Sequence, residues 1–559
     1  MLTRGKSYEE VYSAFRWSVP KRFNMGVACC DRHLARYGGK PALLFLTEDG
    51  RLERYSFADI HRLSNRLANA LVAHGAKRRD RVGILLPQSP AAAIGHIAAY
   101  KAGLIAVPLF TLFGEDALAY RLGDASAGTV ITDDANLAKI MAIRDRLPAL
   151  RLVIVARDAA PKSPLPAGAI DLARALDSSS ERFSPIDTDA DDPALIIYTS
   201  GTTGPPKGAL HAHRTLLGHL TGVEFYHEFL PQPDDVFWTP ADWAWIGGLL
   251  DVLLPAWFHA VPVVACRMRK FDPEFAYRLI ADYQVRNLFL PPTALKLMRQ
   301  VREPRARWSY QIRSIFSGGE SMGEELLAWG REALGVTVNE GYGQTECNLV
   351  LGNCSAVMPV RAGSMGRPVP GHIVEIVDER GNPVPSGTPG IVGVRRPDPV
   401  MLLEYWGNPR ATAEKFAGDW LLTGDVAVKD DEGYFWFRGR ADDIITSAGY
   451  RIGPSEIEDC LLRHPAVAMA AAIGVPDPLR TEIVKAFIVP APGHAPSAAL
   501  AREIQDFVKT RLAAHEYPRL VEFVESLPLT ATGKIMRREL RAKEIAEQAA
   551  PREPTAGSP

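Results

Sequence analysis

A run of glycines, hydroxyl side chains and one lysine follows the apolar segment ALIIY (194–198). Glycines let backbone N–H groups approach a ligand closely, hydroxyls add hydrogen-bond donors, and a lysine adds a cation, all of which a polyphosphate requires. Many Gly-Ser-Thr runs are only polar surface loops, and this spacing differs from the Walker pattern G-x-x-x-x-G-K-[ST]. We therefore predict a nucleoside triphosphate site, distinct from that of P-loop NTPases, formed by Thr199, Ser200, Gly201, Thr202, Thr203, Gly204 and Lys207.

The segment GYGQTE (341–346) also combines side chains suited to a nucleotide. Tyr342 can offer a ring face to adenine, Thr345 a hydroxyl to the α-phosphate, and Glu346 a hard oxygen to Mg²⁺. For Tyr342 alone, an ordinary packing role stays open. The predicted nucleotide-binding residues of this segment are Gly341, Tyr342, Gly343, Gln344 and Thr345, with Glu346 as the metal ligand.

Further segments extend the pattern along the chain in a fixed order. They are SGGES (317–321), NEGYGQTE (339–346), LLTGD (421–425), FRGRADDIITSAGYRIGPSEIE (437–458) and PLTATGKIMRREL (528–540). With the loop at 198–208, they make nearly the whole chain resemble the adenylate-forming superfamily, which includes acyl-CoA synthetases, luciferase-like enzymes and peptide-synthetase adenylation domains.

The resemblance implies roles for residues around the nucleotide. Asp425 would bind both ribose hydroxyls, since one carboxylate can accept two O–H donors, and Arg440 would be its ribose-side partner. An isolated Thr-Gly-Asp is more often a simple turn, so this role depends on the surrounding motifs. The resemblance further assigns Gly319, Glu320 and Ser321 to the adenine and ribose, and Arg451 to the phosphate side.

The resemblance also implies which residues act in catalysis and in CoA binding. Lys534 would bridge carboxylate and α-phosphate, so the expected catalytic residues are Lys534, Thr345 and Glu346. Asp442 matches a hinge position, and Ala448, Gly449 and Tyr450 match a loop at the pantetheine tunnel. The motif around Lys534 also resembles one recognised by protein acetyltransferases in related synthetases, which implies a lysine acetyltransferase and a deacetylase as partners.

The acyl pocket is expected to be lined by Trp243, Trp245, Ile246, Gly247, Gly318 and Gly343. Acetyl-CoA synthetases close this pocket with Trp-Trp before Gln-Thr-Glu, where this chain has Tyr342-Gly343. The missing indole predicts an acid larger than acetate, either short- to medium-chain, branched or aromatic. The motif segments most resemble those of the medium-chain acyl-CoA synthetases, although this chain has Cys347 where that group usually has threonine.

The implied reaction is that of an AMP-forming acid:CoA ligase. Carboxylate attacks the α-phosphorus of ATP to form an acyl-adenylate, and the thiol of coenzyme A then displaces AMP, with Mg²⁺ as the metal. One alternative is a stand-alone adenylation enzyme that loads a carrier protein. Another is a nucleotide- or acyl-binding regulator that has lost catalysis. Family members without catalysis normally lose the residues at positions such as Lys534, Glu346 and Asp425, and this chain retains all three, which argues against a regulator.

The elements that must position these residues form an α/β fold. Residues 40–330 alternate short apolar runs with helix-like patterns, which favours parallel-type sheets wrapped by helices. From about residue 363, turn-rich short strands predict a β module. We expect a large N-terminal ATP- and acyl-binding domain (1–438), a small mobile α+β domain carrying hinge and lysine (439–545), and a disordered tail (546–559).

Composition excludes several classes of function. The 64 Lys and Arg residues nearly balance the 65 Asp and Glu residues, which disfavours a nucleic-acid partner. Six cysteines lack the C-x-x-C spacing of a zinc or redox site and fit a reducing cytoplasm. The N-terminal residues lack a secretory core, and the apolar stretch 246–265 contains Asp251, Pro255 and His259, so we interpret it as buried core without a membrane span.

Overall fold

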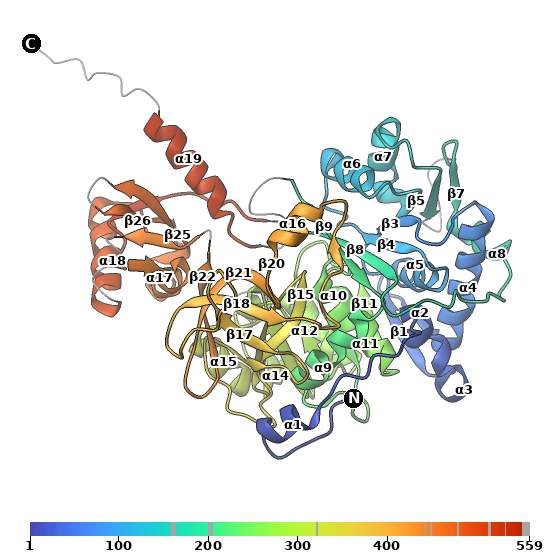
Figure 1. Ribbon diagram of the computed structural model, residues 1–559, viewed down its shortest axis with the longest axis horizontal. Coiled ribbons are helices and arrows are strands. Elements are labelled where there is room, and N and C mark those ends of the chain that lie inside the picture. Colours follow the sequence, from blue (N-terminus) through green and yellow to red (C-terminus); the bar gives the residue numbers. More distant parts are fainter. Residues whose placement is uncertain are drawn as a thin grey trace, which may run out of the picture. The chain divides into compact units, whose positions relative to one another are not determined.

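The structure is a computed structural model that describes residues 1–157, 164–199, 205–319, 322–441, 443–447, 450–477, 480–512, 516–530 and 533–549 (Figure 1). The chain forms two compact units. Unit 1 comprises Met1–Val374, Gly393–Leu421 and Gly433–Phe435, and unit 2 comprises Glu375–Val392, Leu422–Glu432 and Trp436–Pro559. Part of the β module thus belongs to unit 2. The chain therefore passes between the two units at several points, and not only near the boundary at 438/439 that the sequence predicts.

One sheet of unit 1 has the strand order β19-β9-β8-β4-β3-β5-β6-β7 among the described residues. The five pairings from β8 to β7 are parallel, whereas β9 pairs antiparallel with both β8 and β19. The strands are β3 (Arg81–Leu85), β4 (Ile105–Pro108), β5 (Thr129–Asp133), β6 (Leu152–Ala156), β7 (Ala169–Asp171), β8 (Pro193–Thr199), β9 (Lys207–Ala212) and β19 (Glu404–Tyr405).

The second sheet runs through unit 1 in the order β16-β15-β14-β13-β12-β10-β11-β1-β2. Its central pairings are parallel, and those of β1 with β2, β14 with β15 and β15 with β16 are antiparallel. The strands are β1 (Pro41–Leu46), β2 (Leu52–Ser56), β10 (Phe237–Trp238), β11 (Val263–Cys266), β12 (Asn287–Phe289), β13 (Ser314–Gly318), β14 (Val338–Gln344), β15 (Cys347–Gly352) and β16 (Ser364–Pro368); β20 (Phe416–Ala417) is a short strand outside this order.

Helices surround both sheets, as the alternating sequence pattern predicts (Figure 1). In α4, Ser56 and Asp59 form a capping box that satisfies free N–H groups of the first turn. The helices of unit 1 are α1 (Tyr8–Ala14), α2 (Met25–Cys29), η1 (Asp31–His33), α3 (Leu34–Tyr37), α4 (Phe57–Ala73), α5 (Pro90–Lys101), α6 (Glu115–Asp124), α7 (Asp134–Ile143), η2 (Arg144–Arg146), α8 (Leu172–Asp177), α9 (Thr215–Tyr226), α10 (Ile246–Gly248), η3 (Leu249–Leu253), α11 (Leu254–Phe258), α12 (Pro273–Asp282), α13 (Pro292–Met298), α14 (Pro304–Arg307), α15 (Glu324–Trp329), η4 (Gly330–Leu334) and α16 (Pro409–Glu414).

The apolar stretch 246–265 lies in the core of unit 1. It forms α10, η3, α11 and most of β11, and nearly all of its side chains are buried, which confirms its interpretation as core. Asp251 is buried there, and burial raises the pKa of its carboxyl group well above the ordinary value. No helix in the described part of the chain combines the length and apolar character that crossing a bilayer requires.

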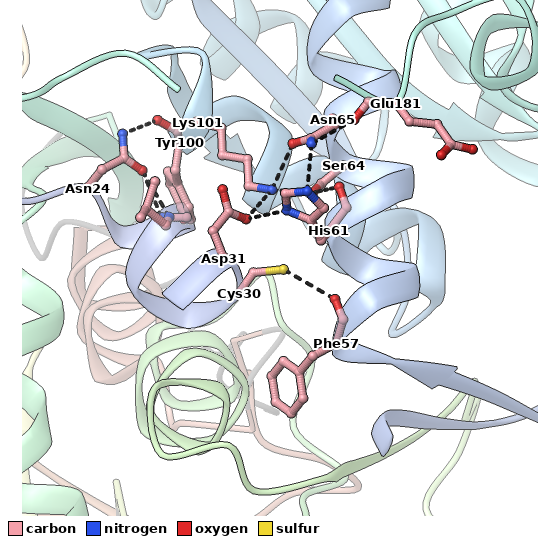
Figure 2. A network of polar contacts seen from close by, with 12 residues as sticks. Asn24, Cys30, Asp31, Phe57, His61, Ser64, Asn65, Tyr100, Lys101 and Glu181 are labelled. Carbon is pink, nitrogen blue, oxygen red and sulfur yellow. Dashed lines mark hydrogen bonds and ion pairs between the residues drawn. The ribbon is translucent and has the colours of Figure 1, made fainter. Parts of the chain in front are cut away.

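A buried polar network joins η1, α4 and α5 (Figure 2). The ammonium of Lys101, which is fully buried, lies 2.5 Å from Asp31 Oδ1 and donates to Ser64 and Asn65. His61 contacts the same carboxylate oxygen at 2.9 Å. Cys30, Asp31 and His61 could together face a metal ion, but Lys101 already neutralises Asp31, and burial raises the pKa of the Cys30 thiol to about 12. We interpret the network as structural.

Unit 2 contains most of the remaining β module and a second sheet. In the module, β17 (Val374–Val377), β18 (Gly390–Arg395), β21 (Trp420–Lys429) and β22 (Phe435–Arg440) lie in that order. The other sheet has the order β24-β23-β26-β25, with β27 on β26. The strands of this sheet are β23 (Ile445–Ser447), β24 (Tyr450–Ile452), β25 (Val467–Asp477), β26 (Thr481–Pro490) and β27 (Leu520–Phe523). The helices in the same part of the chain are α17 (Pro454–Leu461), α18 (Ala498–Arg511) and α19 (Arg537–Ala549).

Unit 2 has the mixed α+β character that the sequence predicts for its C-terminal part. The helix α17 covers PSEIEDCL, and β26 contains the apolar run VKAFIVP. The helix α19 continues to Ala549, so it includes the first residues of the expected tail at 546–559. Residues 550–559 lie outside the described part of the chain.

Candidate active site

The glycine- and hydroxyl-rich run connects β8 to β9. Thr199 pairs with Lys207 across this antiparallel hairpin, and Thr199 Oγ1 donates to the Lys207 carbonyl oxygen at 3.4 Å. The two ends of the predicted phosphate loop are therefore adjacent. The intervening Ser200, Gly201, Thr202, Thr203 and Gly204 lie outside the described residues.

Two further motifs meet at the ends of neighbouring parallel strands in the second sheet. Ser317 pairs with Glu340, and Gly318 pairs with Gly341, so β13 and β14 bring SGGES and GYGQTE together. Gly319 has a φ of +96°, a left-handed conformation that favours glycine. Tyr342 is half-buried on β14. Glu320 and Ser321 lie outside the described residues.

Thr345 and Glu346 form the turn between β14 and β15, where Gln344 pairs with Cys347. Glu346 is 9% exposed, and its Oε1 accepts a hydrogen bond of 2.5 Å from the hydroxyl of Tyr405. Gln344 Oε1 accepts a bond from Lys415 Nζ at 3.4 Å. The turn therefore holds a buried carboxylate in a defined position, as a metal ligand requires.

Tyr405 also contacts the phosphate-loop lysine. Lys207 Nζ lies 5.3 Å from the centroid of the Tyr405 ring, within the range of a cation–π interaction. Lys207 from the first sheet and Glu346 from the second thus converge on one tyrosine. Nothing in LLEYWGN indicates that β19 pairs with β9, so the sequence alone does not identify Tyr405 as a site residue.

A row of aromatic rings lies beside Gly247, which was predicted for the acyl pocket, and beside Gly319, which was predicted for the nucleotide. The ring centroids of Trp245 and Phe289 are 5.7 Å apart, those of Phe289 and Phe316 are 5.0 Å apart, and those of Phe316 and Tyr226 are 4.3 Å apart. A Cβ atom added to Gly319 would lie 3.9 Å from the Trp245 ring. Phe289 and Phe316 were missed because their strands, NLF and SIFSG, have the same apolar pattern as any core strand.

The predicted pocket residues do not all lie in this row. Trp245 and Gly247 do, since a Cβ at Gly247 would lie 2.9 Å from Phe289 and 3.0 Å from Trp245. Trp243 and Ile246, which are close to Trp245 in sequence, are also buried.

The expectation that Gly343 opens pocket volume needs correction. A Cβ at Gly343 would lie 2.4 Å from the backbone nitrogen of Leu349 and 2.6 Å from Asn348 Oδ1. Its missing side chain therefore allows β14 and β15 to approach each other. Gly318 also allows a close strand approach, because a Cβ there would lie 2.9 Å from the Gly341 carbonyl oxygen, but it borders the aromatic row as well, at 3.3 Å from the Phe316 ring.

In unit 2, Asp425 and Arg440 lie together. Arg440 Nη1 is 3.1 Å from Asp425 Oδ1, and the Asp425 side chain is 7% exposed. Asp425 N donates to Thr423 Oγ1, and Gly424 has a φ of +76°. Thr-Gly-Asp lies inside β21 and is not the simple turn that an isolated motif would indicate. The structure therefore pairs the two residues that the family resemblance assigns to the ribose.

The residues expected at the hinge and the CoA tunnel are only partly described. Asp442, Ala448 and Gly449 lie outside the described residues. Tyr450 and Arg451 belong to β24, which pairs antiparallel with β23.

Lys534 occupies an exposed position in a small hairpin of unit 2. Leu529 forms a bridge with Ile535, and the backbone N–H groups of Thr530 and Lys534 donate to the Lys534 carbonyl oxygen and to Thr530 Oγ1. The buried Glu458 and the half-buried Asp443 anchor the neighbouring Arg537, at 2.5 Å and 3.2 Å respectively. Although Arg537 lies in the basic run KIMRRELRAK, it is thus an anchoring residue and not part of a solvated basic face.

The arrangement of the Lys207 hairpin, the β13 and β14 strand ends and the buried Glu346 is compatible with a nucleotide site, and the family comparisons identify the class. A family model described as AMP-binding enzyme matches residues 30–406, and one described as AMP-binding enzyme C-terminal domain matches residues 456–534. The chain belongs to the AMP-binding enzyme family.

Individual relatives narrow the class to acyl-CoA synthetases. The chain is 35% identical to the acetyl-coenzyme A synthetase of Bacillus subtilis, over 97% of this chain and 95% of that protein. The structure matches an anthranilate CoA ligase in complex with anthranoyl-AMP at a TM-score of 0.85 and 30% identity, covering 95% and 99% of the two chains. A benzoate CoA ligase from Burkholderia xenovorans LB400 matches at 0.80 and 28% identity, covering 93% and 100%.

These comparisons confirm several predictions from the sequence. The fold is the adenylate-forming α/β fold with a large N-terminal and a small C-terminal domain, and the chain is an AMP-forming acid:CoA ligase. ATP and coenzyme A are its substrates.

Proposed function

We propose that the chain converts an apolar carboxylate larger than acetate, such as a short- to medium-chain, branched or aromatic acid, to its CoA thioester through an acyl-adenylate. The observation that supports this proposal is the aromatic row Trp245, Phe289, Phe316 and Tyr226 beside Gly319. Aromatic rings offer apolar contact area and no partner for a second charge, so they favour an apolar acyl group over a dicarboxylate.

We assign the phosphates to the β8–β9 hairpin with Lys207, and the ribose to Asp425 with Arg440. Thr345 would donate to the α-phosphate. Glu346 fits Mg²⁺, because its carboxylate is a hard oxygen donor and Mg²⁺ is commonly held by one or two carboxylates together with substrate phosphates. When bound, Mg²⁺ would neutralise charge on the pyrophosphate that leaves.

We assign Lys534 to the adenylation step. Its exposed ammonium would stabilise the negative charge that grows on the α-phosphate and the attacking carboxylate. The coenzyme A thiol would then attack the acyl carbon, and AMP would leave. Acetylation of Lys534 would remove its charge, so an acetyltransferase and a deacetylase could regulate the first step in the cytoplasm.

A pyrophosphate-release assay across C2–C10, branched and aromatic acids, with ATP, Mg²⁺ and coenzyme A, tests the proposed acid class. We expect kcat/KM for the best acid to exceed that for acetate by at least about tenfold, since each additional methylene that an apolar pocket binds is worth ~1–3 kcal/mol. Preference for acetate, the acid in the name of the Bacillus subtilis relative, would contradict the proposal.

Variants locate the acyl site. Trp245→Ala should shift the preference towards longer or bulkier acids, because it removes a ring from the row. Trp308→Ala is the matched control, since Trp308 stacks on Tyr277 at 5.4 Å, outside the aromatic row. If both variants keep the wild-type acid profile while remaining folded, the row does not line the pocket.

A further inference from the structure

Resting on the proposed function, we propose that Tyr405 is a positioning residue that fixes both the Glu346 carboxylate and the Lys207 ammonium for Mg²⁺-ATP. Tyr405 is 5% exposed. Its hydroxyl donates to Glu346 Oε1 and its ring lies beside Lys207 Nζ. One side chain thus contacts the candidate metal ligand and the candidate phosphate ligand.

The backbone around Tyr405 is tied to both sheets. Tyr405 pairs with Ala209 of β9, and Trp406 N donates to the Gly208 carbonyl oxygen at 2.7 Å. On the other side, Leu402 N donates to the Glu346 carbonyl oxygen at 2.9 Å. The segment 402–406 therefore connects the end of the phosphate loop to the turn of β14 and β15.

Further contacts restrict the position of Tyr405 itself. Tyr405 N donates to Thr412 Oγ1 at 2.9 Å, and its carbonyl oxygen accepts from Asn408 N at 2.9 Å. A donor held by such a backbone limits the rotation of the carboxylate that it contacts. Hydrogen-bonded partners of metal ligands orient those ligands in this way, and their loss costs ~10–100-fold in metal affinity.

The hydroxyl and the ring have separable effects. The hydroxyl occupies Glu346 Oε1, and Oε2 accepts no hydrogen bond from the described residues, so it can face a cation. The ring face contacts Lys207 and does not involve the hydroxyl. Tyr405→Phe should therefore weaken only the metal side, whereas Tyr405→Leu should weaken both.

The test measures the affinity of α,β-methylene-ATP, which cannot transfer its adenylyl group to a carboxylate, by calorimetry with saturating Mn²⁺ and again with EDTA. The ratio of the two Kd values is the metal-dependent gain. We expect Tyr405→Phe to reduce this gain about tenfold without changing the Kd in EDTA. Tyr405→Leu should also raise the Kd in EDTA, and Tyr434→Phe, whose hydroxyl donates to the Pro359 carbonyl oxygen, is the matched control.

Glu346→Gln separates the inference from the function on which it rests. If Glu346→Gln reduces the gain and Tyr405→Phe does not, the role of Tyr405 is refuted while the metal assignment stands. If Glu346→Gln leaves the gain unchanged, both are refuted. In kinetics, Tyr405→Phe should raise the apparent KM for Mg²⁺ about tenfold, with kcat restored at saturating Mg²⁺. A lower kcat at every Mg²⁺ concentration would indicate a merely structural role.

Discussion

The charged residues of the candidate site differ in how firmly the protein holds them. Glu346 and Asp425 are buried and hydrogen-bonded, whereas Lys534 is exposed on a hairpin. A buried, oriented carboxylate is pre-organised for a ligand that binds in every cycle. An exposed lysine suits a group needed in one step only, and its contribution should be separable from that of the others.

Lys534→Ala should reduce acyl-adenylate formation by ~10²–10⁴-fold, which corresponds to ~2.7–5.5 kcal/mol for a cation that stabilises the transition state. Thioester formation from supplied acyl-AMP and coenzyme A should be retained. The measurement compares the two half-reactions in the wild type, in Lys534→Ala and in Lys509→Ala, an exposed lysine on α18. Equal loss of both half-reactions in folded Lys534→Ala would contradict its assignment to adenylation.

At the scale of elements, close packing decides where side chains are allowed. The strands β14 and β15 can carry Thr345 and Glu346 on a tight turn because Gly343 leaves room for Leu349 and Asn348. The helices near the first sheet are joined by the buried pair of Lys101 and Asp31. The first arrangement depends on the antiparallel pairing of β14 with β15, and the second depends on a contact between residues far apart in the chain.

Asp31→Asn should lower the free energy of unfolding by about 3–5 kcal/mol, because it leaves the Lys101 ammonium buried without a counter-charge. Urea denaturation followed by tryptophan fluorescence measures the change. Glu414→Gln is the control, since it breaks the exposed pair with Arg410 and should have no measurable effect. Wild-type stability in Asp31→Asn would show that the network in Figure 2 does not hold η1 against α4 and α5.

At the scale of the whole molecule, buried titratable groups couple folding to pH. Burial lowers the pKa of His96, His211 and His219 to about 3 and that of His213 to about 4. Between these values and the ordinary value of ~6.5, the unfolded chain binds more protons than the folded chain. Stability must therefore fall as pH falls below 6.5. Burial raises the pKa of Asp242, Asp251 and Glu458, which acts in the opposite direction but involves fewer groups.

We expect the midpoint of thermal unfolding to fall steadily from pH 7 to pH 5. Each buried histidine contributes up to about 1.4 kcal/mol per pH unit below the unfolded pKa. His96→Phe should make the pH dependence shallower, whereas His494→Asn, at an exposed site, should not change it. A midpoint that is constant or rises towards pH 5 would disprove this expectation.

The two half-reactions should depend differently on movement between the two units. Asp442→Pro restricts φ to about −65° and should slow thioester formation much more than adenylate formation, so that acyl-AMP accumulates. Rapid-quench measurement of acyl-AMP and acyl-CoA tests this, with Asp442→Ala as the control that leaves φ unrestricted. Equal slowing of both steps would place the hinge elsewhere.

The sequence by itself determined the family, the α/β class and the residues of each motif. These properties reside in local spacing: glycines beside hydroxyls predict a phosphate loop, and alternation of apolar runs with helical patterns predicts parallel strands. The pairing of Asp425 with Arg440 was expected from the motif resemblance, and the structure shows it.

Only the tertiary structure decided which distant residues meet. The pairing of β19 with β9 brings Tyr405 to the site, a shared row of rings includes Phe289 and Phe316, and Arg537 binds the carboxylates of Glu458 and Asp443. Gly343, which the sequence predicted to open volume in the acyl pocket, instead allows β14 and β15 to approach each other closely. The physical reason is that local pattern specifies an element and its chemistry, whereas pairing between strands far apart in the chain decides what each side chain contacts.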